Sequence, residues 1–353
     1  MPAVRASPGP SRPTKLLQST DPFSSRYRGE TYYGLPPIKS SYYGWLIVAY
    51  FFIGGLASPL PFIANIVDLF GRKQDRGVVR AGRYIALLGA LISPVLLIGD
   101  LHTPRRWYNM LRIYRRTSAM SIGAWALATF GTFTGVVAFG QALDDLFGWT
   151  FGRWVARLFT WPAALAGGVV SLYTGTLLAA TNIPLWTGGF PYLSSLFTNS
   201  AVSTATAALT LAAEASQASP STRRRLTWLA LFASATELFF ASLVTRQWRR
   251  FKVDAPLQDA SIRRGWRYGV LGLGIVGPLV VHVLEVVRGR TLPRVSALAP
   301  VGALVGGFLM RYVFIFAGNA SGRIPEDYFL STQPSSGSGE IVLRATVPAG
   351  ARS

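Results

Sequence analysis

Cysteine is absent from the 353-residue chain, and histidine occurs only twice, at His102 and His282. A chain without thiolates forms no disulfide, and it cannot by itself hold an iron–sulfur cluster or a thiolate-bound zinc ion. The two histidines fall at a predicted helix end and in a predicted helix middle, so we do not expect them to meet across a haem. We therefore expect this chain to carry no metal centre of its own.

Charged residues are scarce, and acidic ones most of all. Only 14% of the residues are charged, against about 25% in soluble domains. Lys and Arg number 35 and Asp and Glu only 15, which gives a net charge of +20. Half of the chain is hydrophobic, and the basic residues lie between apolar runs, as in the loops of membrane proteins. The composition thus indicates a membrane protein and not a nucleic-acid-binding protein.

The apolar runs predict a bundle of eight membrane-spanning helices within residues 42–320. A bilayer core of about 30 Å needs about 20 helical residues. The stretch 158–213 has no charged residue and is too long for one helix, so we divide it at the turn-forming segment Asn182–Pro191. The glycine pair Gly54-Gly55 and Gly123 are expected to permit close helix packing. The predicted spans are residues 42–64, 84–101, 117–143, two within 158–213, 226–244, 268–287 and 295–317.

The two ends of the chain differ from the middle in composition. Residues 1–41 are rich in Pro, Ser and Arg, and we expect a disordered tail, ordered by docking at most around Tyr32–Pro37. The tail has no apolar core that would make it a signal peptide. Residues 321–353 are rich in Ser and Gly and are expected to be flexible.

An even number of spans places both termini on one side of the membrane. More Lys and Arg residues fall on that side than on the other. The positive-inside rule thus mildly favours cytoplasmic termini in a multi-pass protein of the bacterial cytoplasmic (inner) membrane.

Besides Asp100 at the end of the second span, four ionisable residues lie within the predicted spans: Glu237, His282, Glu285 and Arg311. Such groups are expensive in a membrane and are usually paired or functional. They are interpreted either as a buried ion network that fixes helix packing or as part of a proton path. His282 and Glu285 are three residues apart and share a helix face.

The segment that follows the second span joins an acid, an imidazole and two guanidinium groups: Asp100, His102, Arg105 and Arg106. Aromatic and basic residues at this level are typical of an interfacial anchor. The same groups could exchange protons with an amphipathic ligand. In the fourth span, Tyr173 lies beside small residues and could either bond a neighbouring helix or a ligand carbonyl.

Several short motifs follow one another in a fixed order. They are Tyr50–Gly55, Asp100–Leu101 with Pro104–Arg106, Ser118–Trp125, Tyr173–Gly175 with Asn182–Trp186, and finally Arg311. Together with eight predicted spans, this series resembles the NrfD/PsrC family, the membrane subunits of polysulfide-reductase-type oxidoreductases. The resemblance covers about residues 42–320.

The resemblance implies a quinone-reactive membrane subunit. In such complexes a ferredoxin-like 4Fe-4S subunit docks on the membrane subunit and connects the quinone site to a molybdopterin catalytic subunit. The expected cofactor is a quinone or quinol, menaquinone or ubiquinone, and lipid is the other expected partner. The absence of cysteine agrees with this division of labour.

The resemblance also implies site residues. The quinone-contacting tyrosine of the fourth helix corresponds to Tyr173, and polar contacts early in the first helix fall near Tyr43 and Leu46. Leu46 is apolar where the best-known member has a histidine, and His102 is our candidate to supply an imidazole instead. Asp100 is a candidate proton carrier, and Arg105 and Arg106 are candidate contacts for an anion or a partner.

Two other functions stay open from the sequence. A passive membrane anchor would hold an enzyme without quinone chemistry, which the apolar Leu46 would allow. A secondary transporter would explain the broken segment Asn182–Pro191 and the buried charges. A transporter of this kind should also show an internal repeat, and the sequence shows none.

Overall fold

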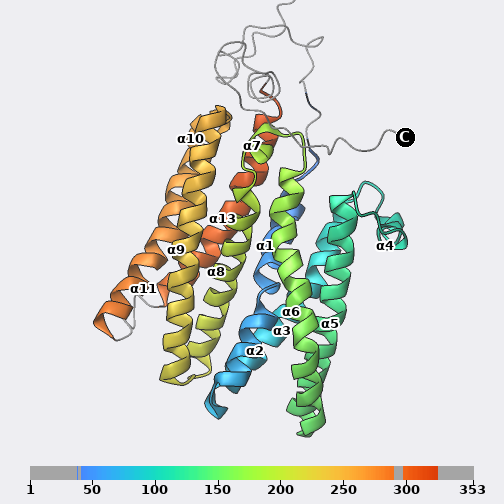
Figure 1. The fold of residues 1–353 in the computed structure, drawn as a ribbon, viewed down its shortest axis with the longest axis vertical. Coiled ribbons are helices and arrows are strands. Elements are labelled where there is room, and N and C mark those ends of the chain that lie inside the picture. The colour runs from blue at the N-terminus through green and yellow to red at the C-terminus, as the bar shows by residue number, and fades with distance from the viewer. Residues whose placement is uncertain (1–37, 39–40, 290–296, 325–353) are drawn as a thin grey trace, which may run out of the picture.

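The computed structural model describes residues 38, 41–289 and 297–324, and every regular element within those segments is a helix (Figure 1). The all-helical expectation is confirmed for this part of the chain. The predicted disordered tail, with its docking segment Tyr32–Pro37, and most of the predicted flexible C-terminal segment lie outside the described residues.

The first half of the chain forms four long rods. The first rod consists of α1 and α2 and is interrupted at Ser58–Pro59, because a proline cannot donate its backbone nitrogen to a helix. Two residues, Gly148 and Trp149, join α5 to α6, and Gly148 takes a positive φ of 66° that a larger residue would resist. The elements are α1 (Trp45–Ala57), α2 (Leu60–Phe70), η2 (Lys73–Asp75), α3 (Arg76–Gly99), η3 (Pro104–Arg106), α4 (Asn109–Arg112), α5 (Ala119–Phe147) and α6 (Thr150–Ala179).

The second half adds four more rods. The short helix α7 (Pro184–Thr187) lies in the predicted break, so α6 and α8 are separate helices as expected. One rod is continuous through α10, a π-helical stretch η5 and α11. The elements are α8 (Tyr192–Ala215), α9 (Pro220–Phe251), η4 (Ala255–Gln258), α10 (Ala260–Arg264), η5 (Gly265–Val276), α11 (Gly277–Arg288) and α13 (Leu298–Ser321).

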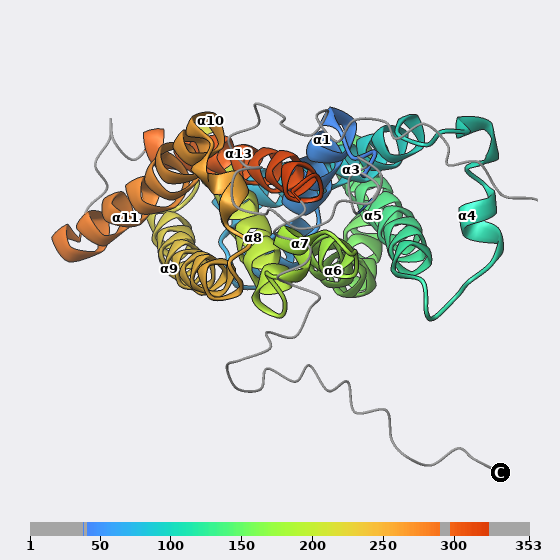
Figure 2. The same ribbon diagram turned by 90° about the horizontal axis from the view of Figure 1, so that it is seen from above.

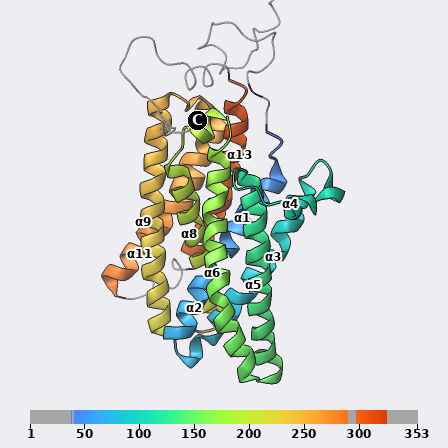
Figure 3. The same ribbon diagram turned by 45° about the vertical axis from the view of Figure 1, so that its right-hand side comes forward.

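Seen along the rods, the helices form two neighbouring groups (Figure 2). One group contains α1 with α2, α3, α5 and α6, and the other contains α8, α9, η5 with α11, and α13. Helices α1 and α13 lie at the contact between the groups and are the most deeply buried spans. The start of α1 and the end of α13 are side by side, since the Asn319 amide donates to the Tyr43 carbonyl oxygen at 2.9 Å. We call this the terminal end of the bundle; α4 projects from it (Figure 3).

Seven helices in the described residues are long and apolar enough to cross a membrane. They support a multi-pass membrane protein, but the count of eight spans is not confirmed. The remaining long helix, α8, has 24 residues, of which four are serine and four threonine. Many of these hydroxyl groups face the interior, where Ser200, Ser203, Thr204 and Thr206 are buried. Its polar composition thus belongs to a helix surrounded by other helices.

Several helices begin earlier than the sequence predicted, which corrects the assignment of a basic loop before the second span. Only Arg72 lies outside a helical element there, and Arg76, Arg80 and Arg83 are in the first turns of α3. The fourth span likewise begins at Thr150 and not at 158. Charged residues ended our predicted spans because they are costly in lipid, but here Arg80, Arg83 and Arg157 form ion pairs within the bundle.

Close crossings use small residues, as expected for membrane helices. Gly274 of η5 lies against Gly306 of α13, where an added Cβ on Gly306 would be only 2.0 Å from the Gly274 Cα. Gly54 and Gly55 similarly contact Ser93 and Arg311, which confirms their expected packing role.

One buried carboxylate ties two connections together at the end opposite the termini. Asp75 is 1% exposed and accepts hydrogen bonds from the Ser219 amide at 2.8 Å, the Ser219 hydroxyl at 2.9 Å and the Thr222 hydroxyl at 2.8 Å. It also accepts from the Arg72 amide at 2.7 Å. The turn before α3 is thereby fixed to the start of α9.

Replacing Asp75 with Ala should therefore lower the free energy of unfolding by about 2–4 kcal/mol, because several buried donors lose their acceptor. Thermal unfolding in detergent measures the effect. Asp254→Ala is the control, since the Asp254 side chain makes no capping hydrogen bond. Equal melting temperatures for the two variants would contradict the role given to Asp75.

Candidate functional site

Three tyrosines from two helices and the segment before α1 converge near the terminal end. Tyr43 precedes α1, and Tyr50 lies on α1 seven residues later, about two helical turns on. Tyr173 lies on α6. Tyr173 is close enough to both of the others for electrostatic interaction, as Tyr50 is to Tyr43. We call Tyr43, Tyr50 and Tyr173 the tyrosine cluster. The sequence predicted Tyr43 and Tyr173 but missed Tyr50, although its seven-residue spacing from Tyr43 indicated a shared face.

The ring of Tyr173 is seated on a glycine of the neighbouring helix. A Cβ added to Gly123 of α5 would lie 1.9 Å from the Tyr173 Cζ, so no other residue fits there without displacing the ring. The predicted packing role of Gly123 is thus confirmed. It belongs to the motif Ser118–Trp125, which therefore shapes the cluster from a third helix.

The hydroxyl groups of the cluster have hydrogen-bonding capacity to spare. The rings are largely enclosed, with Tyr50 2% and Tyr173 9% exposed. Within the described residues, the hydroxyl groups of Tyr43, Tyr50 and Tyr173 make no hydrogen bond. None of the three oxygens is among the fully buried atoms that lack a partner. Buried phenols normally find a partner. The three phenols of the cluster are therefore candidate hydrogen-bond donors to a ligand.

The position of Tyr43 is set by aromatic stacking. Its ring stacks on Trp186 of α7, with ring centroids 5.7 Å apart. Trp186 is fully buried, lies against Gly318 and donates from its indole nitrogen to the Phe314 carbonyl oxygen at 2.7 Å. The motif Asn182–Trp186 therefore supports the cluster, and α13 holds the tryptophan.

Asp100 is the acid nearest to the cluster. It caps the C-terminus of α3 and is close enough to act electrostatically on Tyr43. Partial burial raises the pKa of the Asp100 carboxyl above its usual range. Burial, and then the Asp100 carboxylate, raise the pKa of Tyr43, so this phenol keeps its proton at neutral pH. The pair combines a hydroxyl donor with a group able to exchange a proton.

His102 and Leu46 lie at the edge of this site. The His102 ring is exposed and contacts the edge of Tyr42, with ring centroids 4.9 Å apart. No contact of His102 with the tyrosine cluster is found in the described residues, so its predicted place beside Tyr173 is not supported by the geometry. Leu46 lies next to Gly99, the last residue of α3, and is 41% exposed.

Arg105 and Arg106 lie beyond Asp100 on the exposed segment η3. They have no carboxylate partner within the described residues. Helix α4, with the exposed Arg112, continues the same surface away from the bundle (Figures 1 and 3). The segment offers positive charge and aromatic rings outside the helices.

The four predicted intramembrane ionisable residues fall into two separate pairs. Arg311 of α13 donates to the Ser200 hydroxyl at 2.6 Å and to the Gly307 carbonyl at 2.8 Å. Glu237 of α9 interacts with Ser200, with Ser203 and electrostatically with Arg311. Helix α8 thus lies between the acid and the base and supplies the hydroxyl groups that join them.

The second pair lies on α11, where the His282 Nδ1 is 3.5 Å from the Glu285 Oε2. Both side chains are buried, and their three-residue spacing gives the shared face that was predicted. His282 is on an element that runs toward the end opposite η3, so it and His102 cannot face one ligand (Figure 1). A packing network and a proton path both stay predictions for Glu237, His282, Glu285 and Arg311.

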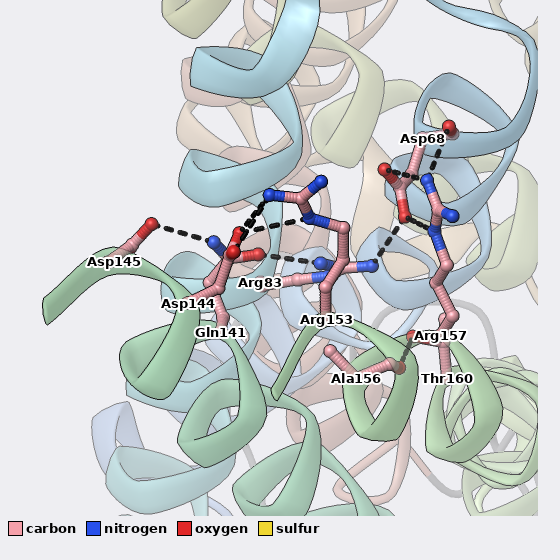
Figure 4. Close-up of polar contacts among 9 residues, drawn as sticks. All are labelled: Asp68, Arg83, Gln141, Asp144, Asp145, Arg153, Ala156, Arg157 and Thr160. Carbon is pink, nitrogen blue, oxygen red and sulfur yellow. Dashed lines mark hydrogen bonds and ion pairs between the residues drawn. The ribbon is translucent and has the colours of Figure 1, made fainter. Parts of the chain in front are cut away.

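A third polar cluster, at the end opposite the termini, was not predicted. Arg83 donates to Gln141 at 2.6 Å and to Asp68 at 3.0 Å, and Figure 4 shows it lying between these two residues. Arg157 makes a two-pronged contact with the same Asp68, at 2.7 and 3.1 Å. The sequence signal was present, because Arg76, Arg80 and Arg83 repeat on one helical face, but we had assigned them to a loop.

Comparison with known families gives one match. The sequence model of a family described as "Polysulphide reductase, NrfD" matches residues 37–321, which include every helix described above. A search of curated proteins gave no match.

The contact of the Tyr173 ring with Gly123 gives a direct test of the cluster. Gly123→Ala should lower the free energy of unfolding by about 1–3 kcal/mol, because the new methyl group overlaps the Tyr173 ring. Thermal unfolding in detergent provides the measurement. Gly135→Ala on the same helix is the matched control, since an added Cβ there meets nothing within 4 Å. If Gly123→Ala melts no lower than Gly135→Ala, Tyr173 does not occupy this seat.

Proposed function

The chain belongs to the NrfD family of polysulphide reductase membrane subunits, and from this premise we propose that it exchanges electrons between a quinone pool and an iron–sulfur partner subunit. The observation that carries the proposal is the tyrosine cluster beside Asp100. Tyr50, Tyr173 and Asp100 lie on the segments that carried the resemblance, and the hydroxyl groups of the cluster have no hydrogen-bond partner within the described residues.

The residues present suit the headgroup of a quinone. A quinone presents two carbonyl oxygens on a flat ring, and phenol hydroxyls can donate to such oxygens. The aromatic walls of Tyr43, Trp186 and Tyr50 suit a flat ring. When bound, a quinone would take up two electrons and two protons to become the quinol, and a quinol would release them.

The chain's own groups would perform the positioning and the proton exchange. We assign the Tyr173 hydroxyl as a hydrogen-bond donor to one ligand oxygen, with its ring held by Gly123. Tyr43 would donate near Asp100, since its raised pKa keeps the phenol protonated. Asp100, at the helix end, would pass a proton between the site and water. His102, exposed beside Tyr42, would act at most as an outer proton carrier.

A ligand that moves in the lipid needs a lateral entrance. Leu46 and Gly99 are both exposed where α1 meets the end of α3, one residue from Asp100. The apolar Leu46 would line this entrance in place of a polar contact. An isoprenoid tail could then stay in lipid while the headgroup reaches Tyr43.

Partner subunits would bind at the terminal end of the bundle. Exposed Arg105 and Arg106 are candidates to bind a ferredoxin-like 4Fe-4S subunit, because they carry unpaired charge beside the proposed quinone site. That subunit would lead to a molybdopterin catalytic subunit. We propose the bacterial inner membrane as the location.

A passive anchor is the second candidate function. The separation of His102 from the tyrosine cluster favours it, because the imidazole expected at the site is not there. The same surface at η3 would then hold a partner without redox chemistry. The transporter hypothesis receives no such support from the geometry.

Tyr173→Phe should reduce quinone-dependent turnover of the assembled complex about 10- to 100-fold, because one hydrogen bond to developing charge is lost. Steady-state assays with a soluble quinone analogue measure the change. Tyr268→Phe is the control, because Tyr268 is 72% exposed and lies on another rod, in η5. Unchanged turnover and unchanged quinone affinity in Tyr173→Phe would remove Tyr173 from the site.

The raised pKa of Asp100 gives a pH signature. If its carboxylate accepts a proton during quinol oxidation, the rate should fall as the pH drops through a pKa above the ordinary value of about 3.9. Asp100→Asn should be slower and should lack this acidic limb. Asp259→Asn, at the cap of α10, should keep this limb, because asparagine also caps helices. A limb that persists in Asp100→Asn would assign the titration to another group.

A further inference from the structure

We propose that the cavity at the end of the bundle opposite the termini binds a phosphate-bearing anion, supplied by the headgroup of an anionic phospholipid. This basic pocket has a volume of about 340 Å³ and lies among α2, α3, α5 and α6. Figure 4 shows its ion-paired core. The residues that line it include seven basic side chains (Arg72, Lys73, Arg76, Arg80, Arg83, Arg153, Arg157) and three acidic ones (Asp68, Asp144, Asp145).

The three acids are already fully engaged by protein groups. Asp68 binds Arg83 and Arg157, as described above. Arg153 holds Asp144 through three contacts between 2.8 and 3.1 Å. The remaining acid, Asp145, accepts bonds from Arg80 at 2.7 Å, Tyr84 at 2.9 Å and Gln141 at 2.9 Å.

Positive charge is left over after this pairing. Arg72, Lys73 and Arg76 line the pocket without a carboxylate partner in the described residues. Arg83 is 2% exposed, and its Nε–H is buried with no hydrogen-bond acceptor. An anion with several oxygens could accept a hydrogen bond from the Arg83 Nε–H and also neutralise charge on Arg72, Lys73 and Arg76. Arginine and lysine groups match phosphate in this respect.

The surroundings favour a lipid as the source of the phosphate. Exposed aromatic side chains flank the pocket on the adjoining turns: Phe70 at 68%, Phe147 at 62% and Trp149 at 55% exposed. Of these residue types, tryptophan is enriched at the level of lipid headgroups. Basic pockets between membrane helices are known to bind anionic headgroups. A phospholipid could thus place its phosphate in the pocket and its chains beside α5 and α6.

The pocket would serve a different purpose from the tyrosine cluster. It lies at the other end of the same helices, which are α3, α5 and α6. Bound lipid would offset part of the excess positive charge where α2, α3, α5 and α6 meet, and so would stabilise the half of the bundle that contains the cluster. The inference does not depend on the proposed redox function.

The test compares two charge-matched triple variants of the full chain. The pocket variant combines Arg72→Gln, Lys73→Gln and Arg76→Gln. It removes the unpaired positive charges of the pocket and leaves its ion pairs in place. Arg112→Gln with Arg115→Gln and Arg116→Gln removes three exposed charges that line no part of it. Each chain is reconstituted in phosphatidylcholine vesicles with or without phosphatidylglycerol, and lipid retained after gentle extraction is counted by native mass spectrometry.

Wild type and the control variant should retain phosphatidylglycerol in preference to phosphatidylcholine. The pocket variant should lose this preference at least tenfold, since each basic residue near the membrane contributes about fivefold to anionic-lipid binding. Equal retention by the pocket variant, or no preference in wild type, would overturn the proposal. Melting temperatures in pure phosphatidylcholine check that both variants fold. If one variant does not fold, the preference of the wild-type chain for phosphatidylglycerol over phosphatidylcholine is the deciding measurement.

A second arm separates a lipid from a free anion. Inorganic phosphate is added to lipid-free protein in detergent, and the melting temperature is followed. If phosphate does not stabilise wild type and does not displace phosphatidylglycerol, the site takes its phosphate from lipid, as proposed. If phosphate alone stabilises wild type but not the pocket variant, the pocket is a site for free phosphate and the lipid assignment is overturned.

Discussion

The scarcity of water inside a helical membrane bundle is the constraint on which this structure depends. A charged or hydroxyl group there must find a partner among other helices, because lipid offers none. Arg311 reaches Ser200, Asp75 collects the donors of the next turn, and Arg83 lies between Gln141 and Asp68. Groups that have no such partner therefore stand out, and two sets of them are the basis of the binding sites proposed above.

Two sets of such groups lie at opposite ends of the first helical group. At the terminal end, the hydroxyls of Tyr43, Tyr50 and Tyr173 have no hydrogen-bond partner in the part of the chain that the structure describes, and small residues such as Gly123 make room for the rings. At the other end, unpaired cations surround a network of saturated aspartates. An uncharged site suits a neutral, hydrogen-bonding ligand, and a positively charged one suits an anion. One helical group would thus bind an electron carrier at one membrane surface and a lipid headgroup at the other.

Much of the fold followed from the sequence, because apolar runs of sufficient length have few alternatives to helices in a membrane. The division at Asn182–Pro191, the shared helix face of His282 and Glu285 and the packing role of Gly123 were foreseen. The helix starts were not, since Arg76, Arg80 and Arg83 were expected in a loop but lie on α3, where Arg80 and Arg83 pair across helices. The site was foreseen in part: Tyr43 and Tyr173 meet, whereas His102 faces Tyr42. Contacts between distant segments, such as Tyr43 with Trp186, cannot be obtained from spacing along one helix.

The central claim is that a quinone headgroup occupies the tyrosine cluster. Photolabelling of the membrane-embedded complex with an azido-quinone, followed by peptide mapping, tests it most directly. The account predicts that the label attaches to peptides containing Tyr43–Tyr50, Gly99–Asp100 or Tyr173 and that excess unlabelled quinone prevents this. Labelling confined to the other helical group, or labelling that unlabelled quinone does not reduce, would contradict it.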